Sequence, residues 1–298
     1  MEKKIQNVAV IGTGTMGAQI AIWVASFNYK VAAFDTNKNS LKMALRYIEV
    51  AEKLAVRKSH LSGKDWEEGS KNILFFTDIG KAVKNSDLVI EAVPEDLDVK
   101  RNIFKTLDSL TPPHTVFATN SSSIPISKIE SATNRPEKCV NIHFYSLVSG
   151  LNMADVMGGN STTSQTIKTV KEWIRSIGCV PLTVKKQIPG FCFNRIWRSV
   201  KREALHMWAD GFVDFRDIDR GWMIAYGTPS GPFGIMDRVG LDVVYDIEMA
   251  YYNESKDPND FPPRALNEKV NRNELGFKTN HGFYMYPDPE YSNPNFLE

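Results

Sequence analysis

The stretch Val8 to Gly17, V-A-V-I-G-T-G-T-M-G, constrains the fold of this chain more than any other. Its four apolar residues predict a buried strand, and the glycines that follow match the spacing G-x-G-x-x-G. In that pattern the first glycine allows a tight turn, the second lets the backbone approach a pyrophosphate, and the third lets the next helix pack closely on the sheet. Met16, Ile20 and Val24 then recur at helical spacing. This order of strand, turn and helix predicts a dinucleotide-binding α/β domain.

A second apolar run, Val31 to Phe34, ends on Asp35, about twenty residues beyond the glycines, where a ribose-binding acid is expected. The next residues are Thr36, Asn37 and Lys38, so no arginine stands there to hold a ribose 2′-phosphate. We therefore expect NAD rather than NADP, although a glycine turn in an unrelated α/β protein is the alternative. The loop residues expected to contact the cofactor are Gly12, Thr13, Gly14, Thr15, Met16 and Gly17.

The charge balance indicates which partners to exclude. The 298 residues are 42% hydrophobic and 24% charged, and 36 Lys and Arg nearly balance 35 Asp and Glu. A formal net charge of +1 gives no global field that would favour nucleic acid or an anionic membrane, so we expect neither as a partner. The length allows two domains with sizeable cores.

The cysteines and the N-terminal residues indicate in which cellular compartment the protein is expected. Cys139, Cys179 and Cys192 lie far apart without a C-x-x-C pair, which argues against a disulfide framework or a zinc site and for a reducing compartment. They could equally be small core residues. The start, M-E-K-K-I-Q, lacks the apolar core of a signal peptide, and no run approaches the length of a membrane span. We expect a cytoplasmic protein without a metal site.

The first part of the chain alternates strand-like and helix-like segments, the pattern of parallel βαβ units. A helix is expected after Asp35, followed by a polar loop that contains Gly63 and Gly69. Polar residues follow two of the later strands, and ligands in such sheets bind beyond the carboxyl ends of the strands. The further expected strands are 73–76, 88–93, 115–119, 139–144, 153–157 and 179–184.

The alternation stops near residues 186–190, and helical patterns then follow one another. The expected helices cover residues 193–209, 218–226, 241–252 and 264–275. We therefore predict an α/β class fold, with a mostly parallel sheet domain over residues 1–187 and an all-helical domain over residues 188–298. Four apolar residues of the first of these helices are candidates for either a subunit interface or the core: Ile196, Val200, Leu205 and Trp208.

Seven blocks resemble the 3-hydroxyacyl-CoA dehydrogenases, in that family's order. They are G-T-G-T-M-G, I-E-A-V-P-E-D, T-N-S-S-S-I-P-I, N-I-H-F, P-G-F-C-F-N-R, G-P-F-G-I-M-D-R-V-G-L-D and G-F-K-T-N-H-G-F-Y. The resemblance covers nearly the whole chain. It implies a Rossmann-like NAD-binding domain, a helical substrate domain that forms a homodimer, and NAD-dependent oxidation of a short-chain 3-hydroxyacyl-CoA to the 3-ketoacyl-CoA and the reverse.

The resemblance implies an acid–base pair. His143 matches the catalytic base, and imidazole suits this task because it titrates near neutral pH. Asp155 stands in the place of the family's glutamate, which accepts the other ring N–H and so fixes the tautomer. From the residues alone, a structural histidine and a loop carboxylate remain the alternatives.

Further roles follow from the same resemblance. Ser122 and Asn194 match side chains that hydrogen-bond or position the substrate oxygen, and we expect Ser122 to contact the cofactor too. Glu95 and Lys100 match cofactor-contacting positions, and Ser146 stands where the family has an asparagine beside the nicotinamide. The alternatives are a plain polar turn for Ser122, a helix N-cap for Asn194, and a solvated helix start for Glu95 and Lys100.

The chain departs from the family after the histidine. Phe144 to Leu147 reads F-Y-S-L where the family usually reads F-F-N-P, and Asp155 is one methylene shorter than glutamate. Three hypotheses therefore remain open: an acyl-CoA substrate, the same chemistry on a free 3-hydroxy acid such as carnitine or gulonate, or an inactive NAD-binding structural relative, as among lens crystallins. Arg57, Lys58 and Lys64 are candidates to contact the phosphates of CoA, or they form a solvated helix face.

Overall fold

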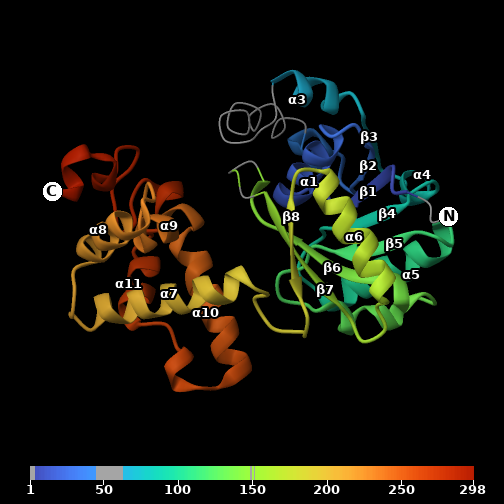
Figure 1. Cartoon of the computed structure of the whole chain (residues 1–298). Coiled ribbons are helices and arrows are strands. Elements are labelled where there is room, and N and C mark those ends of the chain that lie inside the picture. The colour runs from blue at the N-terminus through green and yellow to red at the C-terminus, as the bar shows by residue number, and fades with distance from the viewer. Residues whose placement is uncertain (1–3, 45–62, 148–149, 151) are drawn as a thin grey trace. The chain divides into compact units, whose positions relative to one another are not determined.

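The computed structural model describes residues 4–44, 63–147, 150 and 152–298 (Figure 1). The chain divides into two compact units, Met1–Cys192 and Phe193–Glu298. The first contains a sheet with helices and the second is helical, which confirms the predicted fold class. The boundary placed between residues 187 and 188 stays a prediction.

Eight strands of the described residues form one sheet in the order β3-β2-β1-β4-β5-β6-β7-β8. Neighbours from β3 to β6 are parallel, whereas β7 runs antiparallel to β6 and parallel to β8. The order of the first six is that of a doubly wound dinucleotide-binding fold. The strands are β1 Asn7–Ile11, β2 Lys30–Phe34, β3 Ile73–Phe76, β4 Leu88–Glu91, β5 Val116–Thr119, β6 Cys139–Phe144, β7 Met153–Gly158 and β8 Val180–Val184.

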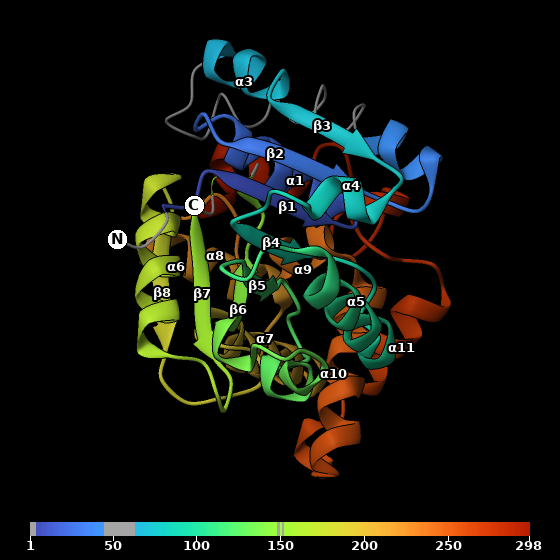
Figure 2. The same ribbon diagram turned by 90° about the vertical axis from the view of Figure 1, so that its right-hand side faces the viewer.

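Helices cover both faces of this sheet (Figure 2). Successive strand residues point to opposite faces, so Val8 and Val10 of β1 join one core while Ala9 and Ile11 join the other. The first core contains residues of α1, α3 and α6, and the second contains residues of α4 and α5. The helices are α1 Thr15–Ala25, α3 Gly63–Ser70, α4 Ile79–Val83, α5 Leu97–Leu110 and α6 Ser164–Ser176.

Helix α3 corrects one expectation. The polar loop predicted around Gly63 and Gly69 is wrong, because Gly63–Ser70 is helical. Trp66 is 1% exposed and belongs to the same core as α1. The buried Trp66 attaches this polar helix to the domain together with Gly69, which is buried against Ser26. The helix expected after Asp35 is present over residues 38–44, and its expected continuation lies outside the described residues.

The second unit contains five helices of eight or more residues in its described chain. They are α7 Phe193–Ala209, α8 Phe215–Tyr226, α9 Pro232–Val239, α10 Leu241–Ser255 and α11 Arg264–Asn271. Only α9 was not predicted. Its first turn depends on the carboxylate of Asp219 in α8, which accepts hydrogen bonds from the backbone N–H groups of Phe233 (2.8 Å) and Gly234 (2.9 Å). Burial raises the pKa of Asp219 to about 6 despite these bonds.

The apolar residues of α7 divide between core and surface. Leu205 is fully buried, and the ring of Trp208 packs edge-on against that of Phe283, with the ring centroids 4.8 Å apart. Val200 is half-buried, whereas Ile196 is 61% exposed. None of the described helices has both the length and the apolar character needed to span a membrane.

A core substitution in α5 tests this packing. Phe104 is fully buried and packs edge-on against Phe117 of β5. Phe104→Ala should lower the free energy of unfolding by about 3–5 kcal/mol, because it leaves a cavity under the helix. Val99→Ala on the same helix is the control, since Val99 is 42% exposed, and it should change stability by less than about 0.5 kcal/mol. Equal losses in urea unfolding would contradict the assigned faces of α5.

Candidate functional site

The turn between β1 and α1 forms a cradle that requires glycine. Gly12 has φ +93°, and a Cβ on it would lie 2.7 Å from the carbonyl oxygen of Ala92. A Cβ on Gly17 would lie 1.9 Å from the carbonyl oxygen of Gly12. By contrast, a Cβ on Gly14 would have no protein atom within 4 Å, and no side chain caps α1 there. The N-terminus of α1 is therefore open to an anion such as a pyrophosphate.

The Asp35 carboxylate closes one side of this cradle. Its Oδ2 accepts hydrogen bonds from the backbone N–H (2.9 Å) and the hydroxyl (3.0 Å) of Thr13, and its Oδ1 accepts one from the N–H of Asn37 (2.9 Å). Asp35 is half-buried at the carboxyl end of β2, where its free lone pairs suit ribose hydroxyls. These residues fit NAD. A cavity of about 380 Å³ adjoins them, lined by Thr13, Gly14, Thr15, Ala18, Asn37, Asn39, Ser40, Met43 and Ala44.

Gln19 links α1 to the segment after β6. It is 2% exposed, its amide nitrogen lies 3.8 Å from the sulfur of Met16, and its oxygen accepts a hydrogen bond from the hydroxyl of Ser146 (3.4 Å). The structure therefore connects Ser146 with the cofactor helix, while direct contact of Met16 or Ser146 with the cofactor stays a prediction. Sequence analysis assigned no role to Gln19. Its amide stands at a core position of an otherwise apolar helix, and this pattern could have indicated a buried polar contact.

His143 and Asp155 meet across the antiparallel pair β6 and β7. They are direct register partners, and His143 Nδ1 lies 3.5 Å from Asp155 Oδ2. His143 is 7% exposed and Asp155 is fully buried. The two residues that sequence analysis paired are thus adjacent, at the carboxyl end of β6 and on the same edge of the sheet as the glycine turn.

Two aromatic rings enclose the imidazole. The ring of Phe191 stacks on it at 5.0 Å with an interplanar angle of 9°, and the ring of Tyr145 meets it edge-on at 4.8 Å. The Tyr145 hydroxyl also donates a hydrogen bond to Asp155 Oδ2 at 2.5 Å. Sequence analysis assigned no role to either ring. Phe191 has φ +50°, an unusual backbone conformation for a residue with a side chain, so the surrounding structure holds it in place.

Glu95 holds the serine turn. Its Oε1 accepts hydrogen bonds from the hydroxyls of Ser121 and Ser123 and from the N–H of Ser123 (3.1 Å). Burial raises the pKa of Glu95, but the bonds from these serines and the charge of Lys100 outweigh burial and lower it below its usual value. An ionised Glu95 therefore fixes the turn that presents the exposed Ser122.

Lys100 supports this arrangement from the interior. It is 1% exposed, and its ammonium group lies 2.7 Å from Glu91 Oε1, 3.2 Å from Glu95 Oε2 and 3.3 Å from the carbonyl oxygen of Val93. Thr119 donates to the other oxygen of Glu91 at 2.6 Å. These contacts show Lys100 as a buried support, so the solvated helix start is wrong for it. Cofactor contact by Glu95 and Lys100 stays a prediction.

The remaining predicted residues belong to other parts of the chain. Asn194 is in the first turn of α7, inside the helix rather than at its N-cap, and its substrate role stays a prediction. Arg57 and Lys58 lie outside the described residues. The Lys64 side chain is 81% exposed and pairs with Glu68 at 3.8 Å, as on a solvated helix face. Within the described part of the chain, no group of three His, Cys, Asp or Glu side chains could hold a metal ion.

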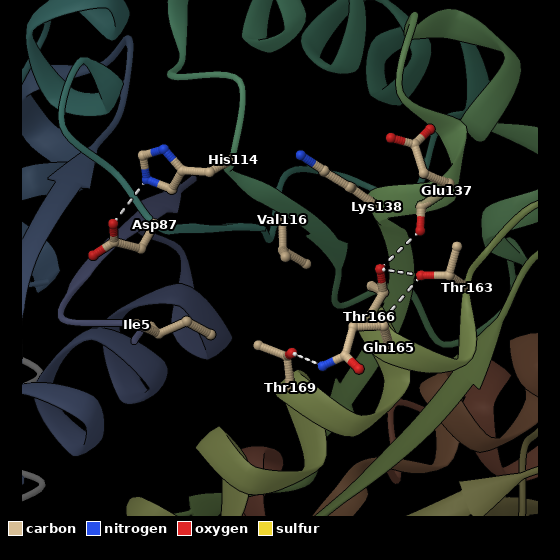
Figure 3. Close-up of a pocket in the computed structure, with 10 residues that line it drawn as sticks. All are labelled: Ile5, Asp87, His114, Val116, Glu137, Lys138, Thr163, Gln165, Thr166 and Thr169. Atoms are coloured by element: carbon tan, nitrogen blue, oxygen red, sulfur yellow. Dashed lines mark hydrogen bonds and ion pairs between the residues drawn. The ribbon is translucent and has the colours of Figure 1, made fainter. Parts of the chain in front are cut away.

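A second cavity, of about 310 Å³, lies at the opposite edge of the sheet (Figure 3). His114 Nε2 approaches Asp87 Oδ1 there at 2.9 Å, and Asp87 Oδ2 accepts from the N–H groups of Gln6 and Asn7. This is the amino end of the parallel strands, whereas ligands of such sheets bind beyond the carboxyl ends. The cavity contains none of the predicted site residues; its lining is Ile5, Asp87, His114, Val116, Glu137, Lys138, Thr163, Gln165, Thr166 and Thr169.

Gly14→Ala separates cofactor binding from folding. Because the added Cβ meets open space in the protein, the melting temperature of the cofactor-free protein should fall by only a few degrees, the cost of alanine in place of glycine at the N-cap of α1. The same Cβ would keep a pyrophosphate from the backbone, so the affinity for NADH should fall by at least about tenfold, as measured by fluorescence titration. Gly221→Ala, another glycine with open space around it, should leave the affinity for NADH unchanged and raise the melting temperature slightly, because alanine favours the interior of helix α8 more than glycine does. Unaltered NADH affinity in Gly14→Ala would refute the cradle.

Comparison with known proteins identifies the family of both domains. The model of the 3-hydroxyacyl-CoA dehydrogenase NAD binding domain matches residues 7–188, and that of the family's C-terminal domain matches residues 190–286. The chain is 34% identical to a 3-hydroxybutyryl-CoA dehydrogenase of Clostridioides difficile over 280 residues, covering 94% of this chain and 99% of that protein.

Other relatives have different substrates in their names. The chain is 33% identical to a 5-formyl-3-hydroxy-2-methylpyridine 4-carboxylate 5-dehydrogenase of Mesorhizobium japonicum over 285 residues, which is 95% of this chain and 91% of that one. It also resembles the solved structure of a diketoreductase that acts on dicarbonyl compounds, with a TM-score of 0.85, 35% identity, and coverage of 95% and 100%. The matched domains and the cradle confirm the predicted family and cofactor: this chain belongs to the 3-hydroxyacyl-CoA dehydrogenases and uses NAD.

Proposed function

We propose that this enzyme oxidises the 3-hydroxyl of a short-chain 3-hydroxyacyl-CoA to the 3-ketoacyl-CoA with NAD, and catalyses the reverse reduction. The observation that carries the proposal is the buried pair of His143 and Asp155 on the same edge of the sheet as the glycine cradle. An acid–base pair beside a dinucleotide site is what hydride transfer from a secondary alcohol requires.

His143 acts as the base for the hydroxyl proton. Its Nδ1 faces Asp155, which leaves Nε2 to take that proton while the O–H electron pair becomes part of the new C=O bond. The glycine cradle and Asp35 would hold NAD⁺, which would supply the acceptor for the hydride of the carbinol carbon. The Asp155 carboxylate then stabilises the imidazolium by its negative charge. Ser122 and Asn194 would position the substrate oxygen by hydrogen bonds.

A free hydroxy acid is the second candidate substrate. Two of the relatives described above are named for substrates other than acyl-CoA, a pyridine carboxylate and dicarbonyl compounds. The segment after His143 also differs from the family, and Leu147, where the family has proline, is fully buried in the core. This candidate keeps the roles of His143 and Asp155 and dispenses with a site for CoA.

Turnover with acetoacetyl-CoA tests the proposed reaction. Wild-type protein should oxidise NADH, followed by its absorbance, and His143→Gln should lower kcat by roughly 10²–10⁴-fold because the proton donor is lost. His281→Gln, which alters an exposed histidine of the second unit, is the control and should retain kcat.

The outcomes separate the candidates. Loss of turnover in His143→Gln alone supports the acyl-CoA reaction. Turnover of free 3-keto acids but not of acetoacetyl-CoA would favour the second candidate, and tight NADH binding without turnover of either would favour the inactive relative. Full activity of His143→Gln would refute the assigned base.

We also propose that the enzyme is a homodimer of the reducing cytoplasm. The second unit exposes apolar side chains that a partner could cover: Ile196 of α7 is 61% exposed, and Val243 and Ile247 of α10 are 40% and 39% exposed. The three cysteines are free, and burial raises the pKa of the Cys139 and Cys179 thiols to about 12, which keeps them inert.

Light scattering should give twice the mass of one chain. Ile196→Asp should shift that mass toward the monomer, because it would bury a charge in the interface. Val180→Asp, at a 56% exposed apolar residue of β8, should leave the mass unchanged. A monomeric wild type, or a dimer indifferent to Ile196→Asp, would contradict the assigned interface.

A further inference from the structure

We propose that Tyr145 is a positioning residue of the acid–base pair, because its hydroxyl holds the Asp155 carboxylate beside His143. Tyr145 and Asp155 would together orient the imidazole of His143, a task that the longer glutamate of the family could perform alone. The inference deepens the proposed function and rests on it for the role of His143.

The strand geometry brings the three side chains together. Tyr145 follows His143 by two residues, and Asp155 is the register partner of His143 on β7. The Tyr145 hydroxyl donates a short hydrogen bond to Asp155 Oδ2, with an O···O distance of 2.5 Å. Tyr145 is 8% exposed and Asp155 is fully buried, so solvent has little access to this bond.

The carboxylate depends on this hydroxyl. A buried charge is expensive unless hydrogen bonds satisfy it. Within the described chain, Asp155 Oδ1 has no hydrogen-bond partner, nor has His143 Nδ1, which lies 3.5 Å from Oδ2, beyond ordinary hydrogen-bond length. The Tyr145 hydroxyl therefore supplies the hydrogen bond that holds the Asp155 carboxyl group between the two strands.

The distance of 3.5 Å between His143 Nδ1 and Asp155 Oδ2 becomes important during catalysis. When His143 takes the substrate proton, its ring becomes positive and carries hydrogen on Nδ1. A carboxylate held in place attracts that N–H, and a small shift would close the distance to a charge-assisted hydrogen bond. A carboxylate free to turn away would not stabilise the imidazolium in this way.

The aromatic contacts of His143 cannot replace this bond. The rings of Phe191 and Tyr145 fix the plane of the imidazole but offer Nδ1 no acceptor. The tautomer that leaves Nε2 unprotonated, ready to act as a base, therefore depends on Asp155 and, through it, on the Tyr145 hydroxyl.

A double-mutant cycle tests the proposal. Tyr145→Phe retains the ring and removes the hydroxyl, so kcat should fall about 10- to 100-fold, the range for loss of a hydrogen bond to a charged group. The KM values for NADH and substrate should stay within about twofold, because Tyr145 is only 8% exposed and the substitution leaves its ring in place. Asp155→Glu should restore kcat in the Tyr145→Phe background, because the longer acid reaches Nδ1 without the hydroxyl, and should lower it in the wild type by crowding.

Tyr29→Phe is the matched control. It removes a hydroxyl that bonds Ser176 Oγ at 2.6 Å on the surface, and kcat should not change. Tyr145→Phe with unaltered kcat would reduce Tyr145 to a packing residue. Equal losses in Tyr145→Phe and in the double variant would exclude positioning through Asp155.

A second readout needs no turnover. Nitrogen NMR of histidine-labelled protein, with His143 assigned from His143→Gln, should show the proton on Nδ1 in the wild type, a mixture of tautomers in Tyr145→Phe, and the Nδ1 form again in the double variant. If acyl-CoA and free keto acids are inert but this pattern appears, the proposed function fails and the role of Tyr145 stands. An identical tautomer in all three proteins would overturn the inference.

Discussion

The antiparallel pairing of β6 with β7 is the constraint on which the candidate active site depends. Val140, Ile142 and Phe144 lie in the apolar core on one face of β6, so His143 must point to the other face. The register then places Asp155 opposite it. A slip of one residue would turn Asp155 to the opposite face and leave His143 without its partner. The hydrophobic pattern of β6 thus fixes the register in which His143 and Asp155 meet.

The parallel strands of the sheet bring the other site residues together. Because β1, β2, β5 and β6 run in one direction, their carboxyl ends share an edge. This edge gathers the glycine cradle, Asp35, the serine turn and His143, which are far apart in the chain. Charged contacts then fix the details. The buried Lys100 holds Glu91 and the more exposed Glu95, and Glu95 in turn holds the serine turn.

Some parts of the structure could not be predicted from single segments. Helix α9 begins where the carboxylate of Asp219, on another helix, caps its N–H groups, and α3 is attached by Trp66. Likewise, the environment of His143 includes Phe191, far along the chain, and the hydroxyl of Tyr145. Each depends on a contact between distant residues, and local propensity contains no information about such a contact.

The sequence by itself determined the order of the strands, most of the helices and the glycine cradle, because hydrophobic periodicity and glycine spacing are local properties. It also paired His143 with Asp155 through motif order, and their catalytic roles stay a prediction. Only the tertiary structure decided that Lys100 is buried, that Gln19 joins Ser146 to the cofactor helix, and that the Tyr145 hydroxyl meets Asp155. These contacts follow from strand register and from the packing of helices on the sheet. Whether a polar side chain faces solvent, a ligand or a buried partner is settled only when the chain closes around it.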